Sequence, residues 1–230
     1  MREHFRDELR MLDEQLCELG SLAADAIAEA TEALLVADQA RAESVLSTHT
    51  RLDALRDEVQ ERAGKLLALQ APVAGELRRI FAALLNATEL ERMGGLAAHI
   101  AKTAQRRHPE HVVTGELAET FRTMGERAHQ LAEHMCQVLR DDDIELARRL
   151  DEEDDLLDRL KQTAHDTLLN EPGVPGASLP ESVQHAVDGV LLARFFERYG
   201  DHAVSVARRV VFRCVGGSPA GGMAATQSAS

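Results

Sequence analysis

Glu91-Arg92-Met93-Gly94 and Glu197-Arg198-Tyr199-Gly200 are two copies of one pattern, E-R-x-G, and they stand 106 residues apart in a chain of 230 residues. Further pairs occur at an offset of 105, so one inserted residue accounts for the difference. These pairs are Asp38 with Asp143, Ala42 with Ala147, Val45 with Leu150, and Leu52-Asp53 with Leu157-Asp158. A repeat of this length indicates a duplicated structural unit. The sequence therefore predicts two similar halves related by pseudo-two-fold symmetry.

The fold class follows from the composition and from the spacing of apolar residues. Ala, Leu, Glu and Arg dominate, and aromatic residues are only 3% of the chain, which favours helix over strand. Apolar positions recur with helical spacing almost throughout. We expect an all-α fold of six long helices in two tandem three-helix bundles. The expected helices cover about residues 2–37, 38–69, 72–107, 114–140, 141–169 and 178–215.

The repeat also predicts where the structural units begin and end. The first repeat is expected at residues 1–109 and the second at residues 110–215. A Gly- and Pro-rich stretch at residues 170–176 reads as a loop, and residues 216–230 have the composition of a disordered tail.

Local residues predict how several helices start. Asp38 and Thr114 are suitable caps for the second and fourth helices. Pro72 is expected in the first turn of the third helix, where its missing N–H costs nothing. Residues 178–181, Ser-Leu-Pro-Glu, form a capping-box pattern before the sixth helix.

The charge and cysteine content limit the possible partners. The formal net charge of -13 argues against binding to nucleic acid, where a basic surface supplies most of the affinity. It is compatible with binding cations or a basic partner, although an acidic surface also simply favours solubility. Three widely spaced cysteines predict neither a disulfide framework nor a thiolate zinc site. No secretory signal or membrane-spanning run is visible, so we expect a cytoplasmic protein that meets membranes only through protein partners.

Two pairs of acidic residues in the second half have the spacing of metal ligands. Glu197 and Asp201 are four residues apart, as are Asp154 and Asp158, so each pair shares one helix face. If the fifth and sixth helices pack antiparallel, the two pairs converge, and hard cations prefer such oxygen ligands. The alternative is a solvated acidic face in which Glu197 pairs with Arg194 or Arg198.

An enzyme is the least favoured function. The chain has no Gly-rich phosphate loop, G-x-S-x-G or H-E-x-x-H motif. A di-metal carboxylate oxidase or hydrolase would need Glu-x-x-His pairs that face the core, and Glu181 with His185 misses that spacing by one residue.

Three segments give the chain a family resemblance. Residues 69–78, LQAPVAGELR, resemble the Q-x-P-V-A-x-D-L-R signature of PhoU-type phosphate-signalling regulators, and residues 89–94 and 196–203 resemble that family's paired E-R-x-G-D-x-A segments. The resemblance covers about residues 1–214. It implies two three-helix bundles with multinuclear metal sites, and a negative regulator of the phosphate-starvation response without catalytic activity. Such a regulator acts as an adaptor between the phosphate ABC transporter and a sensor histidine kinase.

The first repeat departs from this pattern. Gly95 stands where the motif has Asp, and His49 stands where the second repeat has Asp154. Fewer anionic ligands weaken the binding of hard cations, so we expect the stronger site in the second half and a weaker one in the first. The second-half ligands would be Glu197, Asp201, Asp154 and Asp158, and the first-half ligands Glu91, Asp53 and either Glu89 or His49.

The resulting prediction is a metal-binding adaptor that uses divalent or trivalent ions, with iron, zinc, manganese and magnesium as the candidates. Its expected partners are the sensor histidine kinase and the ATPase of the phosphate ABC transporter, and long amphipathic helices leave room for a homodimer. The alternative is a metal-binding or metal-buffering bundle without a signalling role.

Overall fold

The structure is a computed structural model that describes residues 2–69, 72–170 and 179–215. The regular elements of these residues are all helices, joined by short turns, which confirms the all-α prediction. None of the helices has both the length and the apolar composition needed to cross a bilayer. The helices are α1 (Arg2–Val36), α2 (Gln39–Leu69), α3 (Ala74–Arg107), α4 (Gly115–Asp141), α5 (Ile144–Asn170) and α6 (Leu179–Val215).

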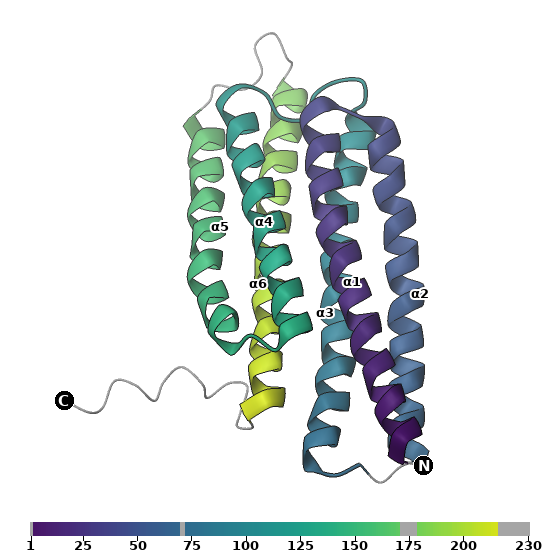
Figure 1. The fold of residues 1–230 in the computed structure, drawn as a ribbon. Coiled ribbons are helices and arrows are strands. Elements are labelled where there is room, and N and C mark those ends of the chain that lie inside the picture. Colours follow the sequence, from purple (N-terminus) through teal and green to yellow (C-terminus); the bar gives the residue numbers. More distant parts are fainter. Residues whose placement is uncertain (1, 70–71, 171–178, 216–230) are drawn as a thin grey trace, which may run out of the picture.

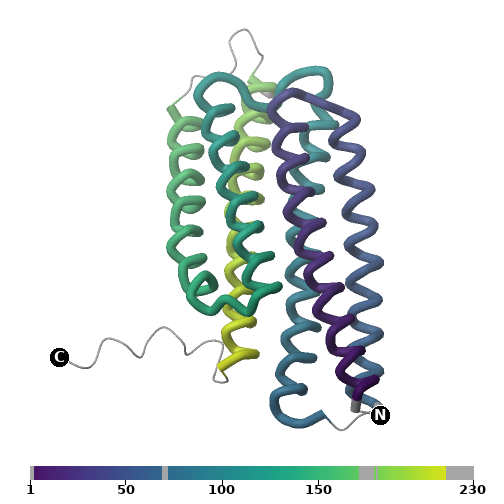
Figure 2. Tube along the Cα trace, viewed as in Figure 1, coloured from purple at the N-terminus to yellow at the C-terminus, as the bar shows by residue number. Residues whose placement is uncertain are grey.

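The six helices form two three-helix bundles that lie side by side (Figure 1). The first bundle contains α1, α2 and α3, and the second contains α4, α5 and α6. Across the junction α1 packs on α4 and α3 packs on α6. The chain trace passes through one bundle before it enters the other (Figure 2), yet the buried apolar side chains of both form one continuous core.

The capping predictions are partly confirmed. Asp38 Oδ1 accepts the Arg41 N–H at 3.0 Å, and in the second half Asp143 Oδ1 accepts the Leu146 N–H at 2.9 Å. Thr114 does occupy the N-cap position of α4, but its side chain makes no capping hydrogen bond.

The predicted place of Pro72 is wrong. Helix α3 begins at Ala74, so Pro72 precedes the helix instead of entering its first turn. The reason is that Val73 takes the cap position, where its N–H donates to the Glu76 carboxylate at 3.1 Å. Asn170, which was predicted as the first residue of a loop, is instead the last residue of α5. The rest of that loop at residues 171–176, the Ser178 capping box and the tail at residues 216–230 fall outside the described residues.

The contact between α1 and α4 shows the predicted pseudo-two-fold symmetry. A β-carbon at Gly20 would lie 3.1 Å from Cys136 Sγ, and a β-carbon at Gly125 would overlap the side chain of Thr31. Gly125 is the repeat equivalent of Gly20, and Cys136 is the equivalent of Thr31. The same glycine contact is therefore made twice, once in each direction, and it permits close approach of the two helices.

Ion pairs join α3 to α6 at both ends of their contact. Asp188, whose side chain is 1% exposed, accepts hydrogen bonds from Arg106 at 2.6 Å and from Arg107 at 2.8 Å. Toward the opposite end, Glu89 accepts a bond from Arg209 at 2.8 Å and also contacts His202. Because the start of α6 meets the end of α3, the two helices run antiparallel.

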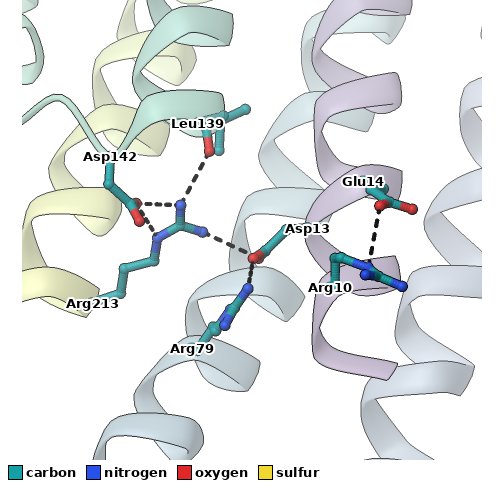
Figure 3. Close-up of polar contacts among 7 residues, drawn as sticks. All are labelled: Arg10, Asp13, Glu14, Arg79, Leu139, Asp142 and Arg213. Carbon is teal, nitrogen blue, oxygen red and sulfur yellow. Dashed lines mark hydrogen bonds and ion pairs between the residues drawn. The ribbon is translucent and has the colours of Figure 1, made fainter. Parts of the chain in front are cut away.

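A third polar cluster lies at the lower end of the junction (Figure 3). The Arg213 guanidinium, near the end of α6, donates to Leu139 O of α4 at 3.1 Å and pairs with Asp142. It also contacts Asp13 of α1, which pairs in turn with Arg79 of α3. By contrast, the neighbouring pair of Arg10 and Glu14 is exposed on α1 and joins no other helix.

The glycine contact gives a first prediction. Replacing Gly125 by Ala should lower the free energy of unfolding by about 1–3 kcal/mol, because the new methyl group would overlap the β-branched side chain of Thr31. At Gly64 of α2, no atom of another described residue lies within 4 Å of the corresponding β-carbon position. Gly64→Ala should therefore raise stability by about 0.5–1 kcal/mol. Urea unfolding of both variants tests the assignment, and equal effects would contradict it.

The Glu89 contact gives a second prediction. The hydrogen bond with His202 lowers the pKa of Glu89 from 4.5 to about 2. A lowered carboxyl pKa contributes stability above pH 4.5 that is lost as the pH falls toward 2. Glu89→Gln should therefore cost about 1–3 kcal/mol near pH 7, and the difference from the wild type should shrink between pH 5 and pH 3. A constant difference across that range, measured by denaturant unfolding, would refute the ionic role of Glu89.

Candidate functional site

Each third helix lies unusually close to the second helix of its own half at the E-R-x-G glycine. A β-carbon at Gly200 would lie 2.8 Å from Leu157 Cδ1, and one at Gly94 would overlap Leu52 Cδ1. Leu52 and Leu157 are repeat equivalents, so the two halves share this contact. Glu91 and Glu197, which precede these glycines by three residues, are thereby brought close to the acidic or histidine side chains of α2 and α5.

In the second half, α5 and α6 bring together the predicted acidic residues. A β-carbon at Gly200 would overlap Asp154 Oδ1, so this carboxylate oxygen lies against the backbone of α6. Burial raises the pKa of the Asp154 carboxyl to about 7, and the nearby charge of Asp201 adds to this effect. Burial and the charge of Glu197 also raise the pKa of Asp201. The two acidic pairs are thus close enough to oppose each other's ionisation.

Two oxygen atoms of this acidic cluster lack partners. Asp154 Oδ1 and Glu197 Oε2 are buried and accept no hydrogen bond from any residue that the structure describes. Buried carboxylate oxygens normally have a donor or a cation beside them. The hard oxygen donors, their mutual repulsion and the two unpaired atoms therefore fit a bound cation.

Basic side chains neutralise part of the cluster. Lys161 Nζ donates to Asp158 Oδ1 at 2.8 Å and to Glu197 Oε1 at 3.0 Å, and Arg194 also pairs with Glu197. The alternative expectation that Glu197 pairs with a nearby arginine is therefore correct for Arg194. Sequence reasoning missed Lys161, although its position three residues after Asp158 placed it on the same helix face.

In the first half, His49, Asp53 and Glu91 form a more compact cluster. Each contributes one possible ligand atom, and the three atoms lie within 4.8 Å of one another. His49 Nδ1 is 3.7 Å from Asp53 Oδ2, and His49 Nε2 is 3.6 Å from Glu91 Oε1. His49 Nε2 is also buried without a hydrogen-bond partner among the described residues. A nitrogen and two carboxylates are a suitable donor set for zinc or iron.

The glycine at position 95 removes a possible fourth ligand from this cluster. A β-carbon at Gly95 would lie 3.3 Å from His49 Nε2, so a carboxylate at this position would point toward the cluster. Arg56 contacts both acids at the edge of the cluster, at 3.8 Å from Asp53 and 4.0 Å from Glu91. The first-half cluster is therefore the more compact of the two, and it carries less negative charge.

The predicted ligand Glu89 does not join the first-half cluster. Its carboxylate lies instead between α3 and α6, where His202 and Arg209 hold it. Glu89 is two residues before Glu91, and residues two apart on a helix point in different directions. His49 is therefore the alternative that the geometry favours.

Comparison with known proteins relates this arrangement to a family. Two segments, residues 16–104 and 121–210, match the family model described as PhoU domain. The first residues of the two segments are 105 positions apart and their last residues are 106 apart, which are the two offsets of the repeat.

Individual relatives match over nearly the whole chain. The phosphate-specific transport system accessory protein PhoU homolog 2 of Mycobacterium tuberculosis is 42% identical over 219 residues, which are 95% of this chain and 100% of that protein. The PhoU homolog 1 of Methanothermobacter thermautotrophicus is 30% identical over 90% of this chain and 93% of its own length.

Solved structures show the same fold. The crystal structure of PhoU from Pseudomonas aeruginosa superimposes with a TM-score of 0.82 at 24% identity, over 91% of this chain and 98% of that one. The phosphate transport system regulatory protein PhoU from Streptococcus pneumoniae gives a TM-score of 0.80 at 21% identity, over 93% and 98% of the two chains. With two copies of the family domain and relatives that match along its length, this chain belongs to the PhoU family.

Proposed function

We propose that this protein is an accessory regulator of the phosphate-specific transport system that represses the phosphate-starvation response when phosphate is abundant. The observation that carries the proposal is the match of 42% identity across 95% of the chain with proteins named as accessories of that system. The proposal assigns no catalytic step. It assigns a binding role in which the protein links the transporter ATPase to a sensor histidine kinase, and in which the chain itself forms a homodimer.

The proposal includes a metal ion in each half. Asp154, Asp158, Glu197 and Asp201 would hold a divalent or trivalent ion in the second half, and His49, Asp53 and Glu91 would hold one in the first. The support is the unpaired Asp154 Oδ1, Glu197 Oε2 and His49 Nε2 atoms. A bound ion would supply positive charge between the second and third helices of each half and so offset the repulsion between the carboxylates.

Metal analysis tests these ligands. Purified protein should retain iron, zinc, manganese or magnesium after extensive dialysis, with a lower metal content in Asp201→Asn and in His49→Ala. The two losses should add in the double variant, because the ligands belong to different halves. Elemental mass spectrometry measures the content, and circular dichroism checks that each variant remains helical.

Asp155→Asn is the matched control for this experiment. Asp155 is exposed and adjoins Asp154, but it lies about 100° away around the helix. Its replacement removes one negative charge from the same acidic run and should leave the metal content unchanged. If Asp155→Asn lowered the content as much as Asp201→Asn, the binding would depend on general surface charge and the assigned site would be wrong.

Deletion of the gene tests the regulatory role. Cells without the protein should take up phosphate through the high-affinity system, and express phosphatase, even in high phosphate. Complementation with the wild-type gene should restore repression. Unchanged phosphate control together with altered metal tolerance would instead support the metal-buffering alternative, which the compact His49 cluster also allows.

A further inference from the structure

Helices α3 and α6 expose the same apolar stripe at equivalent positions. Leu77, Phe81 and Leu85 lie on the first half of α3, and each has an exposed apolar equivalent 106 residues later on α6. These equivalents are Val183, Val187 and Leu191. The six side chains are between 37% and 55% exposed. A spacing of four residues places the three side chains of each set near one line along their helix.

Single exposed apolar residues are common on protein surfaces and need no special explanation. Two matched sets are different. The two halves differ in the residues of their candidate metal clusters, yet both have three exposed apolar side chains at equivalent positions of the repeat. Exposed apolar patches of this kind mark surfaces that bind a partner.

A basic pocket of about 600 Å³ lies between the two stripes. Arg92 and Lys102 of α3 and Arg194 and Arg198 of α6 contribute its positive charges. Arg92 and Arg198 are repeat equivalents, so the pocket spans the pseudo-two-fold axis.

The stripes and the pocket belong to one face. Arg92 follows Leu85 by seven residues on α3, and Arg198 follows Leu191 by seven on α6, which keeps each pair on the same side of its helix. Because α3 and α6 run antiparallel, their stripes extend from the pocket in opposite directions. The face is therefore apolar at both ends and basic in the centre.

The positive charges of the pocket are largely unpaired. Arg92, Lys102 and Arg198 have no hydrogen bond or ion pair with any residue of the described segments. The imbalance occurs on a chain with a formal net charge of -13. His99 and Phe195 also line the pocket, where their rings stack with centroids 5.2 Å apart. A group of unpaired cations at a surface favours an acidic partner.

We propose that this face binds a homodimeric protein across that protein's own two-fold axis, with one copy of this chain on each partner dimer. The partner surface would be acidic where its two subunits meet, opposite the basic pocket. It would be apolar at equal distances on either side, opposite the two stripes, because a pseudo-symmetric face is complementary to a symmetric one. This inference rests on the proposed adaptor function and specifies which surface makes the contact. A second copy of this chain is a poor occupant, since it would bring Arg92 and Arg198 against the same unpaired cations.

The test uses the purified ATPase of the phosphate transporter in its dimeric state and the full-length chain. Isothermal titration calorimetry should give one chain per ATPase dimer. Phe81→Glu and Val187→Glu should each weaken binding by about tenfold or more, as expected for anchor residues of an interface. Arg92→Glu and Arg198→Glu should also weaken it, and the two members of each equivalent pair should have similar effects.

Exposed residues on other faces provide matched controls. Met11 of α1 is 39% exposed, and Arg148 of α5 has an exposed side chain. Met11→Glu and Arg148→Glu introduce the same side chain away from α3 and α6 and should bind like the wild type. All six substitutions are at exposed positions, so circular dichroism and thermal unfolding should show intact folding.

The outcomes separate this inference from the adaptor function. If the wild type binds the ATPase but the four face variants bind equally well, or if two chains bind each dimer, the docking face is wrong while the adaptor function stands. If the wild type binds neither the ATPase nor the dimeric cytoplasmic part of the sensor kinase, both the docking face and the adaptor function are wrong. The docking proposal is also overturned if light scattering shows a homodimer of this chain that Phe81→Glu dissociates. Binding to anionic vesicles that Phe81→Glu and Val187→Glu abolish would overturn it as well.

Discussion

The lack of a side chain at Gly94 and Gly200 is the constraint on which both candidate metal clusters depend. Leu52 and Leu157 occupy the space that a β-carbon would need, so the second and third helices of each half approach more closely than larger residues would permit. Glycine within a helix costs about 1 kcal/mol relative to alanine. Here closer packing of the two helices offsets that cost. The close approach also brings polar side chains of neighbouring helices within reach of one another.

Duplication explains the symmetry of the scaffold, and the side chains explain how the halves differ. The second half keeps Asp201, whereas the first half has Gly95 at that position. It also keeps Asp154 where the first half has His49. Burial, together with the neighbouring acidic charges, raises the pKa of Asp154 in the second cluster to about 7, and Lys161 balances part of that charge. The first cluster has less charge to balance, and its three donors lie closer together.

Sequence patterns predicted the features that depend on local structure and on the repeat. These include the helix cap at Asp38, the two halves and the convergence of the acidic pairs. Apart from the local errors at Pro72 and Thr114, the failures concern contacts made through space. Glu89 pairs with His202 across 113 positions of the chain, and no helical spacing connects those two residues. Likewise, the unpaired state of Arg92 and Arg198 becomes visible only when α3 and α6 are placed side by side.

The first-half cluster and the basic pocket share a wall. His49 and Glu91 belong to the metal-compatible cluster, and both also line the pocket between α3 and α6. Glu91 places a negative charge in this wall, close to the arginines that line the pocket. A cation bound there would neutralise that carboxylate and make the pocket more basic, because opposite charges a few ångströms apart offset each other's fields. If both the metal and the acidic partner bind as proposed, the two events would be coupled through Glu91. The coupling would be reciprocal, since each binding event would favour the other by the same free energy.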